Sequence, residues 1–312
     1  LERRNDPPAV RKILGDFVGA ATLLSASLKF DGTLIIQAQS KGPIQLLVVE
    51  CKSDLSMRAT VKLSVEPSEI DDKAIKVAKH NYPNTIHIGD VTKVNTSTLP
   101  KIDLLIGGSP CQSFSTAGNG KGFNGKSGLF WEYARILKEV KPTYFLLENV
   151  KMKKEWRDII SNELGVEPIE INSKLVSAQN RPRLYWTNIP NISQPTNTNT
   201  LMKHILETNV DKKYALEPAK IDRILNSERG RGFFYDGTQD KCGTVIAFYH
   251  KQPTDGVYVD LGFKRRLTPI EYERLQTVPD NYTNIVADWQ RYKMIGNGWT
   301  VDVIAHIFKS IP

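Results

Sequence analysis

A short, mostly apolar run at residues 102–106 ends in a Gly-Gly-Ser turn, and Pro110, Cys111 and Gln112 follow it directly. An apolar run of this length beside glycines is typical of a buried strand. The open sheets of α/β proteins bind their ligands beyond the carboxyl ends of their strands. The sequence therefore predicts a cysteine thiol at the ligand-binding edge of a buried sheet, where exposure to a cleft and nearby positive charge favour the thiolate.

Strand-like and helical patterns alternate along the chain after residue 69. Residues 72–80 and 129–140 place apolar side chains at helical spacing, and the second of these patterns ends before Pro142. The expected strands cover residues 85–88, 102–106 and 143–147. This alternation predicts an α/β fold with a mostly parallel, doubly wound sheet.

A carboxyl group and two guanidinium groups also fall near the ends of strand-like runs. Glu148 follows an apolar run, and Arg181 and Arg183 lie between two later ones. Alternate residues of an extended chain face the same way, so we expect the two arginine side chains to lie on one side of the chain. Methylation of cytosine at carbon 5 requires a nucleophile at carbon 6 and a proton or hydrogen bond at the ring nitrogen. A thiolate, a carboxyl group and a fixed cation meet these needs.

From about residue 68 to its end, at residue 312, the chain resembles the cytosine-5 DNA methyltransferases of bacterial and phage restriction-modification systems. The matching blocks occur in the order of that family: Ser68-Glu69-Ile70-Asp71, Gly89-Asp90-Val91, Gly108-Ser109-Pro110-Cys111-Gln112-Ser113-Phe114-Ser115, Glu148-Asn149-Val150, Gln179-Asn180-Arg181-Pro182-Arg183, Arg266-Leu267-Thr268-Pro269 with Glu273-Arg274-Leu275-Gln276, and Gly296-Asn297-Gly298. The resemblance implies a Rossmann-like fold and an enzyme that moves a methyl group from S-adenosylmethionine to carbon 5 of cytosine. It also implies a cytosine that is flipped out of the duplex and bound covalently by a cysteine.

The resemblance assigns roles to residues of these blocks. The expected catalytic residues are Cys111, Glu148, Arg181 and Arg183, with Cys111 as the nucleophile and Glu148 holding or protonating the base. Arg181 and Arg183 would clamp the base and its phosphates. The expected donor site consists of Glu69 at the ribose hydroxyls, Asp90 at the adenine amino group, and Ile70, Pro110 and Asn297. The expected DNA contacts are Gln112, Ser113, Gln179, Thr244, Arg231 and Lys241. No metal site is expected.

Residues 190–262 differ from the rest of the chain in composition and pattern, because they combine Asn- and Thr-rich loops, short apolar runs and scattered Lys and Arg. We interpret them as a small, irregular target-recognition domain. The catalytic domain would then cover residues 67–189 and 263–312, and residues 1–66 would form a separate α+β fragment.

The N-terminal region departs from the methyltransferase pattern. The family's donor site begins with a Phe-x-Gly-x-Gly turn after its first strand, a little over twenty residues before the residue that matches Glu69. Residues 45–50 contain no glycine, so this strand and turn are predicted to be missing. Residues 11–65 instead resemble the N-terminal part of the bacterial redox-regulated heat-shock holdase, through residues 14–21, 28–32 and 42–46, although the zinc-binding cysteine cluster of that family is absent.

Composition agrees with a DNA-binding enzyme of the cytoplasm. The chain has 42 Lys and Arg against 34 Asp and Glu, a formal charge of +8 that suits a polyanionic partner. Its three cysteines form no CxxC pair, which fits a reducing compartment. Without a membrane-length apolar run or a signal-peptide pattern, we expect a soluble monomer whose partner is double-stranded DNA.

Three alternatives remain open at the level of sequence. The chain is either an active methyltransferase or a DNA-binding remnant whose donor site is impaired. Residues 120–127 satisfy the phosphate-loop pattern GxxxxGK[ST] of nucleoside triphosphatases. In those enzymes the loop follows its strand directly, whereas here residues 109–118 separate it from the preceding strand. A glycine-rich loop that closes over DNA fits them better. Holdase activity would have to reside in residues 1–65.

Overall fold

The structure, a computed structural model, describes residues 33–39, 44–52, 57–63, 71–110, 123, 126–227 and 232–312. The chain divides into two compact units, unit 1 with Leu1–Ile70 and Ala78–Ile102, and unit 2 with Asp71–Val77 and Asp103–Pro312. Helix α2 (Asp72–Asn81) contains the sequence boundary between them, and it confirms the helix that the sequence predicts at residues 72–80.

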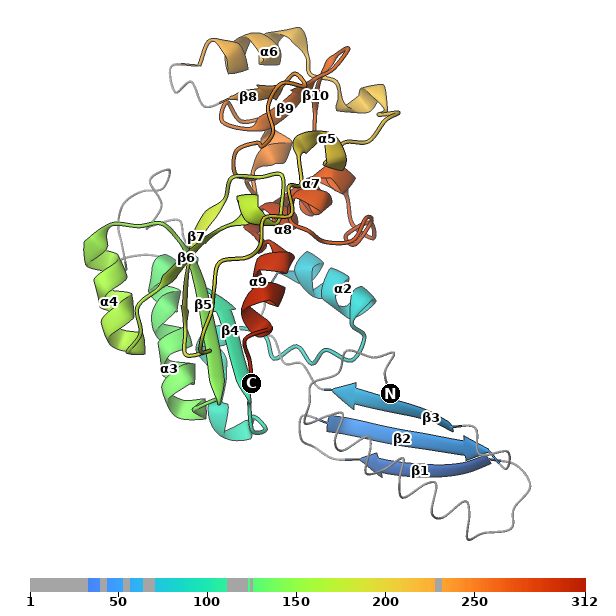
Figure 1. The fold of residues 1–312 in the computed structure, drawn as a ribbon, viewed down its shortest axis with the longest axis vertical. Helices are drawn as coiled ribbons and strands as arrows, with labels where there is room; N and C mark the ends of the chain where they lie inside the picture. The colour runs from blue at the N-terminus through green and yellow to red at the C-terminus, as the bar shows by residue number, and fades with distance from the viewer. Residues whose placement is uncertain are drawn as a thin grey trace. The chain divides into compact units, whose positions relative to one another are not determined.

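Unit 1 contains an antiparallel three-stranded sheet (Figure 1). Its strands are β1 (Thr33–Gln39), β2 (Ile44–Lys52) and β3 (Met57–Leu63), with β2 in the middle. The glycine-free run at residues 45–50 lies in β2, which pairs with β1 and β3. Residues 45–50 therefore belong to a meander of neighbouring strands and not to a strand that leads through a glycine turn into a helix.

Among the described residues of unit 1, residues 82–102 are mostly irregular, and the strand predicted at residues 85–88 is wrong. Only Thr85 makes an isolated bridge, and two 3₁₀ turns follow, η1 (Val91–Lys93) and η2 (Thr96–Thr98). The Thr-Ile-His-Ile pattern has the alternation of a strand, but a strand also needs a neighbour to pair with, and local sequence does not specify one.

Unit 2 is built on a four-stranded sheet in the order β4-β5-β7-β6. The strands are β4 (Leu104–Gly108), β5 (Tyr144–Val150), β6 (Ile169–Asn172) and β7 (Pro182–Thr187). The predicted strands at 102–106 and 143–147 are confirmed as β4 and β5, which pair in parallel. The other two pairings are antiparallel, so the described sheet is mixed, not mostly parallel as expected. The short connection from β6 to β7, through η4 (Ser173–Leu175), permits only an antiparallel return.

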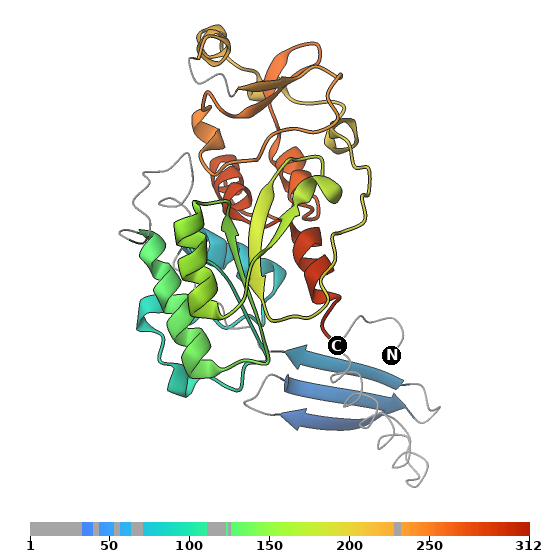
Figure 2. The same ribbon diagram turned by 60° about the vertical axis from the view of Figure 1, so that its left-hand side comes forward.

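Helices cover both faces of this sheet (Figure 2). Helix α3 (Phe130–Val140), preceded by η3 (Lys126–Leu129), confirms the helix expected at 129–140 and ends at Lys141, which has a left-handed backbone. With α4 (Lys154–Leu164) it packs on one face around Leu147 and Trp186. Helix α9 (Val301–Phe308) packs on the other face around Leu146 and Ile171. The layers are those of an α/β sandwich.

The remaining elements of unit 2 are short and share a second core. They are α5 (Met202–Ile205), η5 (Lys212–Tyr214), α6 (Pro218–Leu225), β8 (Phe233–Tyr235), η6 (Tyr249–Lys251), β9 (Val257–Asp260), β10 (Lys264–Arg266), α7 (Pro269–Leu275) and α8 (Asp288–Asn297). Strand β9 lies between β8 and β10 in a small sheet. The core beneath it joins residues of 190–262 to residues of α7 and α8.

Four buried tyrosines form the centre of this second core. The ring of Tyr249 lies 4.9 Å from Tyr272, 5.1 Å from Tyr292 and 5.6 Å from Tyr258, measured between ring centroids. The Tyr249 hydroxyl donates to the Val257 carbonyl and accepts from the Leu267 amide. Two of these tyrosines come from residues 190–262 and two from α7 and α8, so the two parts of the chain fold around one cluster.

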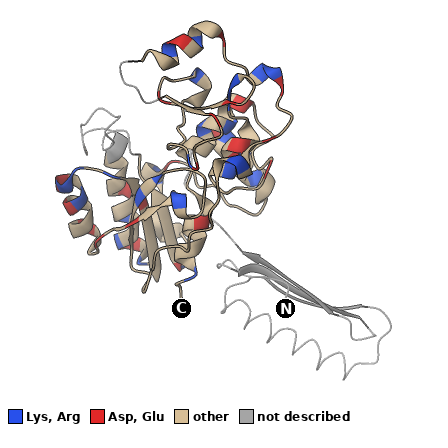
Figure 3. Cartoon of the chain, turned by 45° about the horizontal axis from the view of Figure 1, so that its top comes forward, with Lys and Arg blue, Asp and Glu red and all other residues tan. Residues whose placement is uncertain are grey.

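Lys and Arg are interspersed with Asp and Glu along the described helices of unit 2 (Figure 3). None of the described helices combines the length and the hydropathy of a membrane span.

Candidate active site

Glu148 lies near the carboxyl end of β5, between Gly108 of β4 and Tyr185 of β7. Its side chain is 12% exposed, and both carboxylate oxygens have a partner. Oε1 lies 2.9 Å from the guanidinium Nε of Arg183, and Oε2 accepts a hydrogen bond of 3.1 Å from the indole Nε1 of Trp299. The carboxyl group is therefore held in one orientation at the edge of the sheet.

Burial raises the pKa of Glu148 above its usual value, although Arg183, Arg181 and the Trp299 hydrogen bond act in the opposite direction. Desolvation disfavours the charged form of a carboxyl group, while a nearby cation or hydrogen-bond donor favours it. A carboxyl group with a raised pKa can retain a proton closer to neutral pH. It is therefore suited to donating a proton or a hydrogen bond to a ring nitrogen.

The glycine at the end of β4 gives Trp299 its place beside Glu148. A Cβ atom at Gly108 would lie 3.1 Å from Trp299 Nε1 and 3.4 Å from Glu148 Oε2. The first of these contacts is tighter than carbon makes with its neighbours at its optimum separation of roughly 3.5–4.0 Å. Glycine at residue 108 thus leaves the indole N–H room to reach the carboxylate.

Asn149 ties the ends of β4 and β5 together. It is 1% exposed, and its Nδ2 donates to Ser109 through the side-chain Oγ at 2.9 Å and the carbonyl at 3.3 Å. Ser109 immediately precedes the half-buried Pro110 and the expected nucleophile Cys111. Ser109, two residues before Cys111, is thus fixed to the strand that carries Glu148.

The expected nucleophile Cys111 and the expected DNA contacts Gln112 and Ser113 lie outside the described residues, whereas another cysteine, Cys242, lies within them. Cys242 is 3% exposed, and burial raises the pKa of its thiol to about 12. A thiol with so high a pKa is protonated at neutral pH and is a poor nucleophile. Cys242 is therefore a core residue.

Arg181 and Arg183 make their closest polar contacts with different groups, and the clamp on a base and its phosphates stays a prediction. Arg183 pairs with Glu148, whereas the guanidinium of Arg181 is buried and donates to the backbone carbonyls of Val245 at 3.0 Å and Gly298 at 2.9 Å. A longer bond of 3.3 Å reaches the Gly296 carbonyl. Burial and the neighbouring Arg183 lower the pKa of Arg181 to about 10, so it stays charged at neutral pH. Arg181 joins two loops behind the carboxyl group.

Three of the expected DNA contacts also make internal hydrogen bonds. Gln179 is fully buried, and its amide donates to the Leu275 carbonyl and to Gln276 Oε1. The ammonium of Lys241 donates to the carbonyls of Ser177 at 3.0 Å and Thr200 at 2.6 Å. Thr244 is half-buried and donates to the Asn180 carbonyl at 2.8 Å. These side chains fix the backbone around Arg181, and Arg231 lies outside the described residues.

The turn at η6 presents an aromatic ring and a cation that the sequence analysis does not single out. Phe248 is 58% exposed, and the ammonium of Lys251 lies 5.5 Å from its ring centroid. Between them in sequence, Tyr249 anchors the turn in the core. An exposed ring beside a lysine, held on a fixed turn, is suited to stacking and phosphate contact. The signal available in sequence was the Phe-Tyr-His-Lys string after Thr244.

The residues expected to bind the methyl donor belong to both units. Glu69 and Ile70 lie outside the described residues. In unit 1, Asp90 Oδ1 caps η1 by accepting from the Thr92 amide and hydroxyl, and these bonds lower the pKa of Asp90. In unit 2, Asn297 is exposed at the end of α8. The ionised Asp90 carboxylate can accept hydrogen bonds, and the exposed Asn297 side-chain amide can both donate and accept them.

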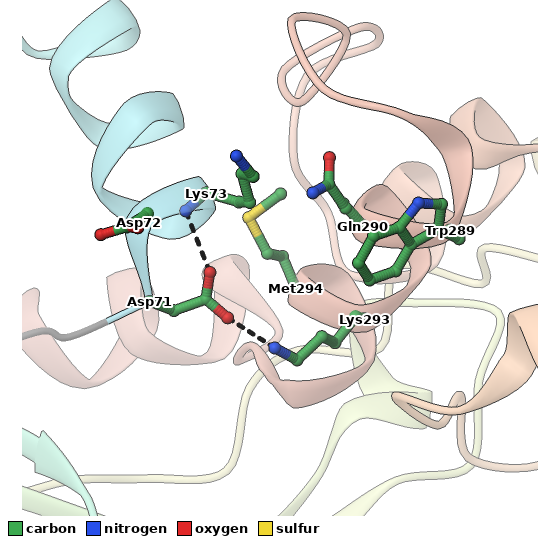
Figure 4. A pocket seen from close by; sticks show the side chains of 7 residues that line it. All are labelled: Asp71, Asp72, Lys73, Trp289, Gln290, Lys293 and Met294. Atoms are coloured by element: carbon green, nitrogen blue, oxygen red, sulfur yellow. Dashed lines mark hydrogen bonds and ion pairs between the residues drawn. The ribbon is translucent and has the colours of Figure 1, made fainter.

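A small cavity of about 240 Å³ lies elsewhere in unit 2, between the start of α2 and the start of α8. Figure 4 shows Asp71 within it, accepting from the Lys73 amide at 3.0 Å and paired with Lys293 at 2.5 Å. The cavity is below the roughly 300–1,000 Å³ of a usual ligand site. None of the residues that line it surrounds Glu148, so it is distinct from the candidate active site.

The fold and the site together define an α/β methyltransferase. The Dnmt2 methyltransferase of S. pombe, at 18% identity, has a similar fold with a TM-score of 0.60 over 78% of this chain and 88% of that one. The sequence model of the C-5 cytosine-specific DNA methylases matches residues 54–312, and the chain belongs to that family. The family that the sequence motifs indicate, the fold class and the class of enzyme, a DNA cytosine methyltransferase, are thereby confirmed.

Two bacterial relatives extend this result. A Type II methyltransferase of Lactococcus lactis subsp. cremoris is 37% identical over 77% of this chain and 70% of its own length. One of Shigella sonnei is 35% identical over 78% of this chain and 72% of its own length. Residues 1–100 match the sequence model of the Hsp33 protein, which confirms the resemblance of the N-terminal region to the heat-shock holdase.

Sequence reasoning missed Trp299 and the role of Asn149. Asn149 stood in the matched Glu-Asn-Val block without an assigned function, so the signal was present. Trp299 follows the Gly-Asn-Gly block, and its partner Glu148 is 151 residues away. No local pattern connects the two.

Proposed function

We propose that this chain methylates carbon 5 of cytosine in double-stranded DNA, with S-adenosylmethionine as the methyl donor and Cys111 as the nucleophile. The observation that supports the proposal is the carboxyl group of Glu148, which is fixed between Arg183 and Trp299 and has a raised pKa. Glu148 lies opposite Gly108 at the end of β4, and Cys111 follows Gly108 by three residues in the sequence.

The chemistry follows from the roles of the residues. The Cys111 thiolate forms a bond to carbon 6 of the cytosine while Glu148 gives its proton to the ring nitrogen N3, which turns carbon 5 into a nucleophile. S-Adenosylmethionine supplies a methyl group made electrophilic by its sulfonium. After carbon 5 has gained the methyl group, it loses its proton to solvent, the carbon–sulfur bond breaks, and the N3 proton returns to Glu148. Arg183 stabilises the carboxylate while its proton is on the base.

We assign the donor to Glu69, Ile70, Asp90, Pro110 and Asn297, with Asp90 at the adenine amino group. The cytosine must leave the stack to reach this site, at a cost of a few kcal/mol that pocket contacts repay. For DNA we retain Gln112, Ser113, Thr244 and Arg231, and add Phe248 and Lys251. We assign Gln179 and Lys241 to the support of the backbone, because their polar atoms are engaged internally.

We place this activity in a restriction-modification system or in the self-protection of a phage, since the bacterial relatives are named Type II methyltransferases. The second candidate, a DNA-binding remnant with an impaired donor site, is favoured by the antiparallel meander that occupies residues 45–50. The two candidates differ in methyl transfer but share the cysteine chemistry.

The test uses duplex DNA in two forms. DNA carrying 5-fluorocytosine in the methylated sequence should form a covalent complex in the presence of S-adenosylmethionine, because fluorine at carbon 5 cannot leave as a proton. DNA with tritium at carbon 5 should release it to water even without the donor, because the adduct exchanges hydrogen at that carbon. Cys111→Ser should abolish both signals, whereas Cys242→Ser, at a buried core position, should retain them.

Each result has a distinct meaning. Tritium release without covalent trapping would identify the impaired remnant. Adduct formation or tritium release by Cys111→Ser would refute Cys111 as the nucleophile. Loss of tritium release in Glu148→Gln, with DNA binding intact, is the expected sign that the carboxyl proton is needed.

A further inference from the structure

We propose that Trp299 is a positioning residue of the reaction, whose indole N–H holds the Glu148 carboxyl group in the orientation that presents it to the base. The inference rests on the proposed function of Glu148. The inference extends the proposed function by adding a residue from the loop between α8 and α9, outside the matched Gly-Asn-Gly block.

The first argument is the division of the two carboxylate oxygens. Arg183 takes Oε1 at 2.9 Å and Trp299 takes Oε2 at 3.1 Å. With a donor on each oxygen the carboxyl plane cannot rotate without breaking one contact. With Arg183 alone, rotation about the end of the side chain would cost less, because the terminal torsion of Glu is broad.

The second argument is that the residues on either side of Trp299 are fixed. The Gly298 carbonyl accepts from Arg181 and from Gln276, both at 2.9 Å. Thr300 is 1% exposed and its hydroxyl interacts with Gln276 Oε1 and with the Ser173 hydroxyl, both at 2.8 Å. A tryptophan between two such residues has little freedom in its backbone, so the indole reaches the carboxylate from a fixed position.

The third argument is the space that the sheet leaves for the indole. At Gly108 any larger side chain would approach Trp299 Nε1 and Glu148 Oε2. The indole also packs against the core that α9 forms with the sheet. The ring is thus held by apolar packing while its single polar atom faces the carboxylate, which is the arrangement that a buried tryptophan requires.

The chemistry of an indole suits this position. Its N–H donates and cannot accept or carry charge, so it favours the ionised carboxylate without adding a cation. The charged and titratable described groups that act on Glu148 are Arg183 and Arg181, and Tyr185 lies opposite it on β7. Removal of the indole donor should raise the pKa of Glu148 further. If the protonated carboxyl is the active form, activity is present below its pKa and is lost as the pH rises through it. The alkaline limb of the pH profile should then move upward.

The experiment compares Trp299→Phe with the parent enzyme and with Trp289→Phe, a matched control at a 50% exposed position on α8. The readout is release of tritium from carbon 5 of cytosine in duplex DNA, measured from pH 5 to pH 10, which needs no methyl donor. For Trp299→Phe we expect kcat to fall about tenfold or more with KM for DNA unchanged. We also expect the alkaline limb to move up by about one pH unit, the size of one hydrogen bond to a charged group. Trp289→Phe should match the parent.

A second readout does not depend on activity. The tryptophan emission that is present in the parent and absent in Trp299→Phe should change with pH as Glu148 titrates, and Glu148→Gln should abolish this change. A titration that persists in Glu148→Gln, or a Trp299→Phe enzyme with unchanged kcat and unchanged pH profile, would overturn the inference. Should the parent show the fluorescence titration but release no tritium, the pairing of Trp299 with Glu148 stands and the proposed function fails.

Discussion

Gly296 is the position where one added methyl group should disturb the site most. It lies in the last turn of α8, where a Cβ atom would come within 2.3 Å of the Ile246 carbonyl carbon and 2.5 Å of the Ala247 nitrogen. Both atoms belong to the backbone, so no rotamer change can relieve the contact. The Ile246 amide and carbonyl are also bonded to the Tyr272 hydroxyl, at 2.7 and 2.8 Å, which limits how far this segment can move.

The magnitude follows from these contacts. Carbon atoms pack at roughly 3.5–4.0 Å, so α8 and the segment at Ile246 would have to separate by about 1 Å. Overpacking of this kind costs about 1–3 kcal/mol, and the upper end applies because backbone must move. Alanine regains up to about 1 kcal/mol of helix propensity over glycine. The net loss for Gly296→Ala is about 2 kcal/mol, or about 4–8 °C in the melting temperature of a unit of this size.

Differential scanning calorimetry of the full chain provides the measurement, and Gly298→Ala provides the control. Residue 298 has a φ of −71° and its added Cβ would lie 3.3 Å from the nearest atom, the Met294 carbonyl oxygen. We expect this variant to melt within about 2 °C of the parent, because alanine can adopt this φ and the neighbouring carbonyl needs to shift by only a few tenths of an ångström. A Gly296→Ala protein that melts with the parent, or one no less stable than Gly298→Ala, would refute the packing argument.

Three further predictions concern function. Exchange of residues 190–262 for those of another family member should change the DNA sequence that is methylated and leave the chemistry unaltered, as sequencing of methylated DNA would reveal; an unchanged target would contradict it. S-Adenosylmethionine should bind weakly in calorimetry, and replacement of residues 1–67 by a family-type strand and Phe-x-Gly-x-Gly turn should restore methylation by orders of magnitude. Micromolar binding by the chain as it stands would contradict this prediction, because the N-terminal segment would then supply the missing wall of the methyl-donor pocket. Lys251→Met should reduce the salt dependence of DNA binding by about one ion, while Lys241→Met, whose ammonium is engaged by two carbonyls, should lower stability and leave that dependence unchanged.

The sequence predicts those parts of the fold that depend on local periodicity. Helix α3 and strands β4 and β5 fall within two or three residues of the predicted bounds, because their apolar spacing and their boundaries, such as the stop before Pro142, are written in the segment itself. The run at 85–88 has the same alternation but forms no strand, since pairing is decided by distant segments.

The candidate site divides in the same way. The pairing of Glu148 with Arg183 agrees with the expectation that an acid and a guanidinium meet at the strand ends. The burial of Gln179 and the internal bonds of Lys241 could not be read from residue types that are usually exposed. They depend on α7 and on the segment at Thr200, which reach these side chains only after folding.

With target recognition assigned to residues 190–262, as we propose, the cluster of four tyrosines limits how the enzyme can acquire a new target sequence. Tyr249 and Tyr258 are at once parts of the segment expected to read DNA and half of a core whose other half, Tyr272 and Tyr292, belongs to the helices behind the active site. A recognition segment inherited from another gene would have to bring rings that fit this core. Phe248 and Lys251 flank Tyr249 but are exposed, so they carry no such condition. Variation in DNA contacts can accumulate there one codon at a time.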